Sequence, residues 1–113
     1  MLDAPMPDVL TPPGALLMQE RAAEAATLLR LLGNERRLLL LCQLLVEGEA
    51  SVGSLAIHVG LSQPALSQHL AKLREDGLVA TRRSGTTIHY RIADPRVAAL
   101  IATLKDLFCS DLG

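Results

Sequence analysis

The stretch that decides the fold is residues 51–79, SVGSLAIHVGLSQPALSQHLAKLREDGLV. Ser51 can cap a first short helix, which Gly60 then ends. Ser62 can cap a second helix with Pro64 in its first turn, where a missing backbone N–H costs nothing. Two helices joined by a tight glycine turn are typical of a helix-turn-helix, whose second helix can lie in a DNA major groove.

The second helix of this stretch has two different faces. Leu66, Leu70 and Leu73 fall at i, i+4 and i+7, which predicts a buried face. Asp76-Gly77 is expected to stop the helix. The opposite, outward face carries side chains suited to DNA, namely Gln63, Pro64, Ser67, Gln68 and Lys72.

A basic hairpin is expected directly after this helix. Residues 79–83 (VATRR) and 86–92 (TTIHYRI) are typical of β-strands, and Ser84-Gly85 is expected to form the turn between them. A helix-turn-helix followed by a basic hairpin is a winged helix. The tip of the wing offers side chains suited to phosphate contact, namely Arg82, Arg83, Ser84, Thr86 and Thr87.

Composition favours a helical domain around this motif. The chain has 113 residues, half of them apolar, and only two aromatic side chains, so Leu, Ala, Val and Ile must form the core. Further helices are expected over residues 15–32, over 35–46 as the buried central helix, and after Asp94-Pro95. The predicted fold is mainly α with a small β-hairpin, in the order α-α-α-α-β-β-α. Residues 1–13, which hold four prolines, are expected to be a disordered tail before a single domain of residues 14–113.

Charge is divided along the chain. Residues 60–96 hold six basic and three acidic residues, a net charge of +3, whereas the remainder carries −4. A basic reading head on an acidic body favours an oriented encounter with DNA.

The last helix carries a wide apolar stripe for so small a domain: Val97, Leu100, Ile101, Leu104 and Phe108. We expect this stripe, with the first helix, to form a two-fold dimer interface. A homodimer would place two recognition helices about one DNA turn apart, as needed to read an inverted repeat.

Other classes of protein fit less well. The longest apolar run is interrupted by Gln43 and too short to span a bilayer, and the acidic, proline-rich start is unlike a signal peptide. We therefore expect a cytoplasmic protein. The chain has no Cys-x-x-Cys, no nucleophile–base constellation at recognisable spacing and no phosphate loop, so we expect neither an enzyme nor a cofactor.

The order of elements and the strings NERRLLLLCQLL, LSQPALSQHLAKLREDGLV and TTIHYRIADPRV resemble the ArsR family of winged-helix repressors. The resemblance covers nearly the whole chain after the tail. It implies a homodimeric repressor that an inducer releases from its operator. It also implies that the DNA-reading positions are Gln63, Ser67, Gln68 and His69. Pro64 stands where the family often has a small polar residue, so one contact there is lost or replaced by apolar packing.

The two metal sites common in the ArsR family lack their ligands here. The first helix of the helix-turn-helix has no cysteine, and no histidine follows His89 in the last helix. His58, His69 and His89 lie on separate elements and are better interpreted as polar surface or packing residues than as ligands. No metal site is therefore predicted.

Two cysteines remain, Cys42 on the central helix and Cys109 at the end of the last helix. One interpretation is that both are small apolar residues. The pair also resembles the dithiol branch of the family (BigR- and SqrR-like repressors), which senses persulfides. That resemblance implies that Cys42 and Cys109 form a sensor for a low-molecular-weight persulfide or polysulfide. The alternatives are a metal- or metalloid-responsive repressor and a winged-helix protein-interaction module without a sensor.

Overall fold

The structure is a computed structural model that describes residues 13–109. It divides into two compact units, residues 1–34 and 35–113, each of which is described by itself. In the first unit, helix α2 (Pro13–Leu32) begins two residues before the predicted start. The tail was predicted for residues 1–13; Pro13 already belongs to α2, and residues 1–12 lie outside the described residues. No described helix is long and apolar enough to cross a membrane.

The helix-turn-helix forms as its capping residues predict. It consists of α4 (Val52–Val59) and α5 (Gln63–Glu75). The Ser51 side chain accepts a hydrogen bond from the Ser54 amide, and the Ser62 side chain accepts one from the Ala65 amide. Between the helices, Gly60 takes the left-handed conformation (φ +67°), which glycine adopts without the penalty of a Cβ.

The second unit begins with α3 (Glu35–Glu47), which packs against both α4 and α6 (Pro95–Cys109). Asp94 caps α6, since its Oδ1 accepts a hydrogen bond from the Arg96 amide at 2.9 Å. The prediction of a buried central helix is correct for one face only: Leu40, Leu41 and Leu44 of α3 are at most 1% exposed, whereas Leu39 and Val46 are 46% and 63% exposed. The same core holds Leu55, Leu66, Leu70, Leu73, Val97 and Ile101.

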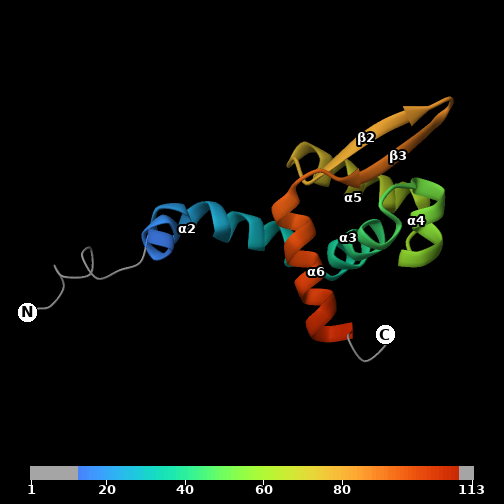
Figure 1. Ribbon diagram of the computed structural model, residues 1–113. Helices are drawn as coiled ribbons and strands as arrows, with labels where there is room; N and C mark the ends of the chain where they lie inside the picture. The colour runs from blue at the N-terminus through green and yellow to red at the C-terminus, as the bar shows by residue number, and fades with distance from the viewer. Residues whose placement is uncertain (1–12, 110–113) are drawn as a thin grey trace, which may run out of the picture. The chain divides into compact units, whose positions relative to one another are not determined.

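The sheet has one strand more than predicted. β2 (Val79–Ser84) and β3 (Thr87–Ile92) form the expected antiparallel hairpin, which projects beyond the helices (Figure 1). β1 (Ala50–Ser51), just before α4, pairs with the other edge of β3 and gives the strand order β1-β3-β2. The predicted turn was wrong by one residue, because Ser84 still pairs with Thr87 and the loop is Gly85-Thr86. The five helices and the hairpin of the described residues confirm the predicted winged helix-turn-helix.

Candidate DNA-binding surface and thiol site

The outward face of α5 presents the side chains that the sequence assigned to DNA reading. Gln63, Pro64, Ser67, Gln68 and Lys72 are exposed, and His69 is half-buried. Leu66, Leu70 and Leu73 on the other side of the helix are fully buried. Packing therefore fixes which face of α5 is available, while contact with DNA remains a prediction.

Lys72 is already ion-paired within its own helix. Its Nζ lies 3.3 Å from Glu75 Oε1 and 3.6 Å from Asp76 Oδ1. The hydrogen bond to Glu75, followed by the charge of Asp76, raises the pKa of Lys72. Lys72 is thus charged, but the two neighbouring carboxylates offset its positive charge.

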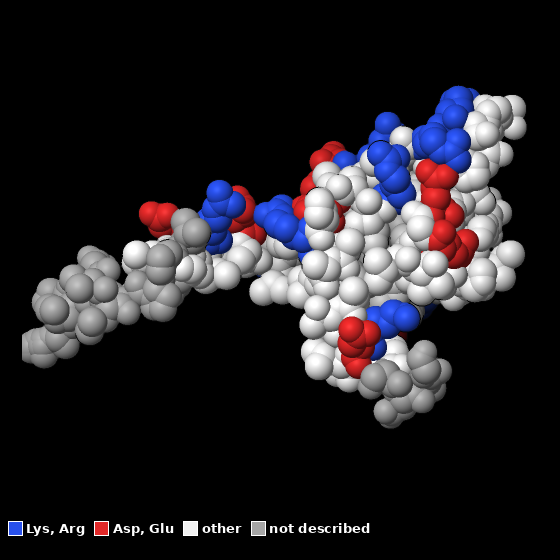
Figure 2. All heavy atoms as spheres, in the orientation of Figure 1, with Lys and Arg blue, Asp and Glu red and all other residues white. Residues whose placement is uncertain are grey.

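The wing exposes every side chain predicted at its tip: Arg82, Arg83, Ser84, Thr86 and Thr87. Figure 2 shows basic side chains gathered over the hairpin, with acidic side chains next to them. Arg82 is bound to Glu49, the residue just before β1. Its Nη2 donates to Glu49 Oε1 at 2.6 Å, and its Nε donates to Glu49 Oε2 at 3.1 Å. The two arginines predicted at the wing tip therefore differ, because Arg82 has a carboxylate partner and Arg83 has none among the described residues.

The apolar stripe of α6 does not serve one purpose. Val97 and Ile101 are completely buried in the core of their own chain, so the expectation that they lie between protomers was wrong. Helical spacing identifies an apolar face without saying what covers it. Leu100 and Leu104 are half-buried, and Phe108 is 80% exposed. These three residues remain candidates for a dimer interface.

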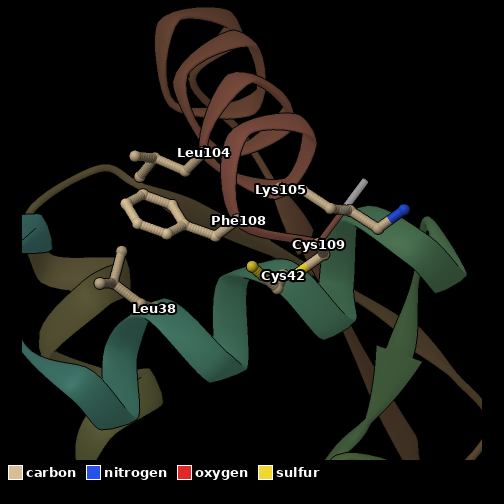
Figure 3. A pocket seen from close by; sticks show the side chains of 6 residues that line it. All are labelled: Leu38, Cys42, Leu104, Lys105, Phe108 and Cys109. Carbon is tan, nitrogen blue, oxygen red and sulfur yellow. The ribbon is translucent and has the colours of Figure 1, made fainter. Parts of the chain in front are cut away.

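Cys42 and Cys109 meet at one cavity. It measures about 180 Å³ and lies between α3 and α6, and its lining is Leu38, Cys42, Leu104, Lys105, Phe108 and Cys109. Figure 3 shows Cys42 on α3 and Cys109 at the end of α6 next to each other, with Leu104 and Phe108 on one side and Lys105 on the other. Both thiols are free; Cys42 is half-buried and Cys109 is exposed. Two residues that are 67 positions apart in the sequence thus form one site.

The surroundings of Cys42 keep its sulfur protonated. Burial raises the pKa of the Cys42 thiol, and the nearby Cys109 raises it further. The cation of Lys105 acts in the opposite direction but does not outweigh them. Because the thiolate is the reactive form, these surroundings lower the reactivity of Cys42, and Cys109 is the more accessible of the two thiols.

Sequence reasoning missed three residues of these sites. Leu38 and Lys105 precede Cys42 and Cys109 by four residues each, a helical spacing that could have identified them. Glu49 lies 33 positions from Arg82, and no local pattern connects the two. Within residues 13–109, no three His, Cys, Asp or Glu side chains lie close enough to hold a metal ion.

Comparisons with known proteins agree with this architecture. Residues 34–81 match the family model described as "Bacterial regulatory protein, arsR family". The chain is 49% identical to the transcriptional activator HlyU of Vibrio cholerae over 81% of its own length and 84% of that protein. It is 47% identical to the biofilm growth-associated repressor of Xylella fastidiosa, over 82% of this chain and 81% of that one.

Solved structures give the same result. The structure of reduced HlyU from Vibrio cholerae has a TM-score of 0.75 over 81% of this chain and 96% of its own, at 49% identity. The transcriptional repressor BigR from Xylella fastidiosa has a TM-score of 0.74 over 81% and 93%, at 48% identity. The antimony-specific repressor AntR has a TM-score of 0.78 over 98% of each chain, at 30% identity.

These relatives are named transcriptional regulators, which confirms the prediction that the chain is not an enzyme. The fold, the exposed polar face of α5 and the sequence identities all indicate a DNA-binding regulator. This chain is a DNA-binding transcriptional regulator and belongs to the ArsR family.

Proposed function

We propose that this regulator is a thiol-based sensor in which reactive sulfur species, such as low-molecular-weight persulfides, oxidise Cys42 and Cys109 and release the operator. The observation that carries the proposal is that both cysteines line one small cavity between α3 and α6. A relative at 49% identity, HlyU, has been solved in a form named reduced, which supports redox chemistry in this part of the family.

Exposure assigns the first step to Cys109. Its thiolate attacks the outer sulfur of a persulfide R–S–SH, and the S–S bond of the persulfide breaks. The outer sulfur is transferred to Cys109 as Cys109–S–SH, and the thiolate R–S⁻ leaves. The neighbouring cation of Lys105 favours the departure of this anion.

Cys42 then resolves the adduct. Its sulfur attacks the Cys109 sulfur and forms the disulfide, and the departing hydrosulfide takes up the Cys42 proton and leaves as H₂S. Two thiols are oxidised, and one persulfide is reduced to a thiol and H₂S. If both cysteines are persulfidated first, attack of one adduct on the other with loss of H₂S leaves a trisulfide. The apolar lining of the cavity favours either bridge over a hydrated, charged adduct.

A bridge between α3 and α6 has a direct route to the reading head. α3 leads through residues 48 and 49 into β1 and α4, so a shift of α3 moves the start of the helix-turn-helix. A coupling free energy of ~1–3 kcal/mol would change operator affinity by about 5- to 150-fold.

The DNA-bound form proposed here is a homodimer on an inverted repeat. The exposed face of α5 lies in the major groove with Gln63, Ser67, Gln68 and His69 toward the bases, and Arg83, Thr86 and Thr87 lie near phosphates. Leu100, Leu104 and Phe108 are then covered by the partner chain.

The decisive experiment compares the wild type with Cys42→Ser and Cys109→Ser. Both variants should fold and bind operator DNA, because neither side chain lies on α5 or the wing. Glutathione persulfide should release only the wild type, and mass spectrometry should then find an intramolecular bridge. A Cys42→Ala variant controls for the polarity of serine at a half-buried position. Release of either serine variant by persulfide would overturn the proposal.

A metalloid sensor is the competing function, because AntR is a structural neighbour and thiolates bind soft metal ions. The same assay separates the two. Release of the wild type by stoichiometric antimonite or zinc, without formation of a bridge, would assign the cysteines to metal binding.

A further inference from the structure

The wing is joined to the segment between α3 and β1 by one fork-shaped ion pair, Arg82–Glu49. Nε and Nη2 of Arg82 each donate to a different oxygen of Glu49, at 3.1 and 2.6 Å. Two parallel hydrogen bonds of this kind are also how an arginine binds a phosphate. Glu49 therefore occupies one of the two guanidinium edges with which Arg82 could bind a DNA phosphate, and its carboxylate offsets the charge of Arg82.

The register of the sheet explains why these two residues meet. Arg82 on β2 lies opposite His89 on β3, and His89 lies opposite Ser51 on β1. Directly opposed residues share a face of a sheet, and so do residues two apart along a strand. Glu49 and Arg91 consequently lie on the same face as Arg82 and His89.

Glu49 is the acidic member of this group of four. The hydrogen bond from Arg82 lowers the pKa of the Glu49 carboxyl, and the charges of Arg82, His89 and Arg91 lower it further. Glu49 is thus an anion throughout the neutral range. It neutralises one arginine in the part of the molecule that is expected to meet the phosphate backbone.

We propose that Glu49 is an internal substitute for a DNA phosphate, which holds Arg82 away from the duplex and limits the affinity of the wing. In place of the phosphate contact expected of Arg82, the wild-type wing makes its arginine–phosphate contact through Arg83. This inference concerns DNA affinity alone and does not depend on how the cysteines sense their inducer.

The proposal predicts a change in salt dependence. Each phosphate that a protein neutralises adds about −0.9 to the slope of log K against log salt. Glu49→Gln removes the carboxylate charge and frees Arg82 for one more phosphate. The variant should bind DNA more tightly than the wild type at low salt, with a slope steeper by about 0.9. Between 50 and 200 mM salt it should therefore lose about 3.5-fold more affinity than the wild type.

Two further variants make this test specific. Asp106→Asn makes the same change of charge near the end of α6, where the side chain is exposed. It should leave the salt slope unchanged. Combining Glu49→Gln with Arg82→Gln should remove the gain, because the freed guanidinium is then absent.

A measurement on the wild type covers the case of a variant that does not fold. In NMR spectra of the arginine side chains, addition of DNA should shift the Nε signal of Arg83 and leave that of Arg82 in place. The proposal is overturned if the two signals shift equally. It is also overturned if Glu49→Gln weakens binding or leaves the slope unchanged, since Glu49 would then only support the wing.

Discussion

Helix α5 and the last two turns of α6 differ in how far their apolar side chains are buried. Leu66, Leu70 and Leu73 of α5 are fully buried, so this helix completes its packing within one chain. Leu107 and Phe108 near the end of α6 are 70% and 80% exposed, and Phe108 lines the cavity between the two cysteines.

The difference separates a fixed surface from one that can change partners. A helix held by three buried leucines presents its outer face in one orientation, as base recognition requires. An apolar end that is still exposed gains stability whenever something covers it, at about 25 cal/mol for each Å² removed from water. A second chain can supply this cover.

The largest expected effect tests what covers α6. Leu104→Asp should give a monomer, because a charge at a half-buried apolar position opposes burial against a partner. Loss of the linked second half-site should weaken operator binding by about 10²- to 10⁴-fold. Analytical ultracentrifugation checks the assembly. Ala99→Asp, an exposed position on the other side of the helix, should stay dimeric; a dimeric Leu104→Asp would exclude this interface.

The next prediction compares how much the buried face of α5 and the exposed end of α6 contribute to the free energy of unfolding. Leu70→Ala leaves a cavity in a closed core and should lower the free energy of unfolding by about 2–5 kcal/mol. Leu107→Ala should change it by less than about 0.5 kcal/mol at protein concentrations where the chain is monomeric. Urea denaturation of both variants provides the measurement. Equal losses of unfolding free energy in the two variants would show that Leu70 and Leu107 are packed equally well.

Within the reading head, bases and phosphates should respond differently. Gln68→Ala should lower the discrimination between operator and random DNA by about 1–3 kcal/mol, because a base-edge contact carries sequence information. Arg83→Ala should weaken binding to both DNAs equally and flatten the salt slope by about 0.9. Titrations with both DNAs at several salt concentrations test this pair. An unchanged operator preference in Gln68→Ala would remove this residue from the reading set.

The smallest effect concerns protonation at the cavity. The pKa of Cys42 is raised, mainly by burial, so its thiol is the dominant form at neutral pH and its thiolate increases as the pH rises. In a Cys109→Ala background, alkylation of Cys42 by iodoacetamide should therefore accelerate with pH. Lys105→Gln removes the influence that lowers this pKa and should slow alkylation at each pH, whereas Lys105→Arg should not. Alkylation that is independent of pH near neutrality would contradict this assignment.

Local sequence signals predicted the two helices of the helix-turn-helix well. Ser51, Gly60 and Ser62 act within four residues of themselves, so their capping roles follow from sequence alone. The two-residue strand β1 was missed because it exists only through pairing with β3, about 40 positions later. The Arg82–Glu49 pair was missed for the same reason.

The candidate sites were predicted in part. Periodicity identified the exposed face of α5, because the spacing of apolar residues within one helix is enough to separate its buried face from its exposed face. The same reasoning grouped Val97 and Ile101 with Leu104, although the first two pack inside the chain. Which helix covers an apolar side chain depends on tertiary packing, and a 3.6-residue period carries no information about it.

The short strand β1 also has a mechanical consequence for the wing. In the middle of the hairpin, His89 and Tyr90 lie between two strands, whereas Ile88 and Thr87 nearer the tip pair only with β2. Amide hydrogen exchange should therefore be slow at His89 and Tyr90 and fast at the tip, because a two-stranded ribbon alone is barely stable in water. The pairing with β1 therefore holds the middle of the wing in place. Its two-stranded tip can follow the local curvature of a DNA duplex without a shift of the helices.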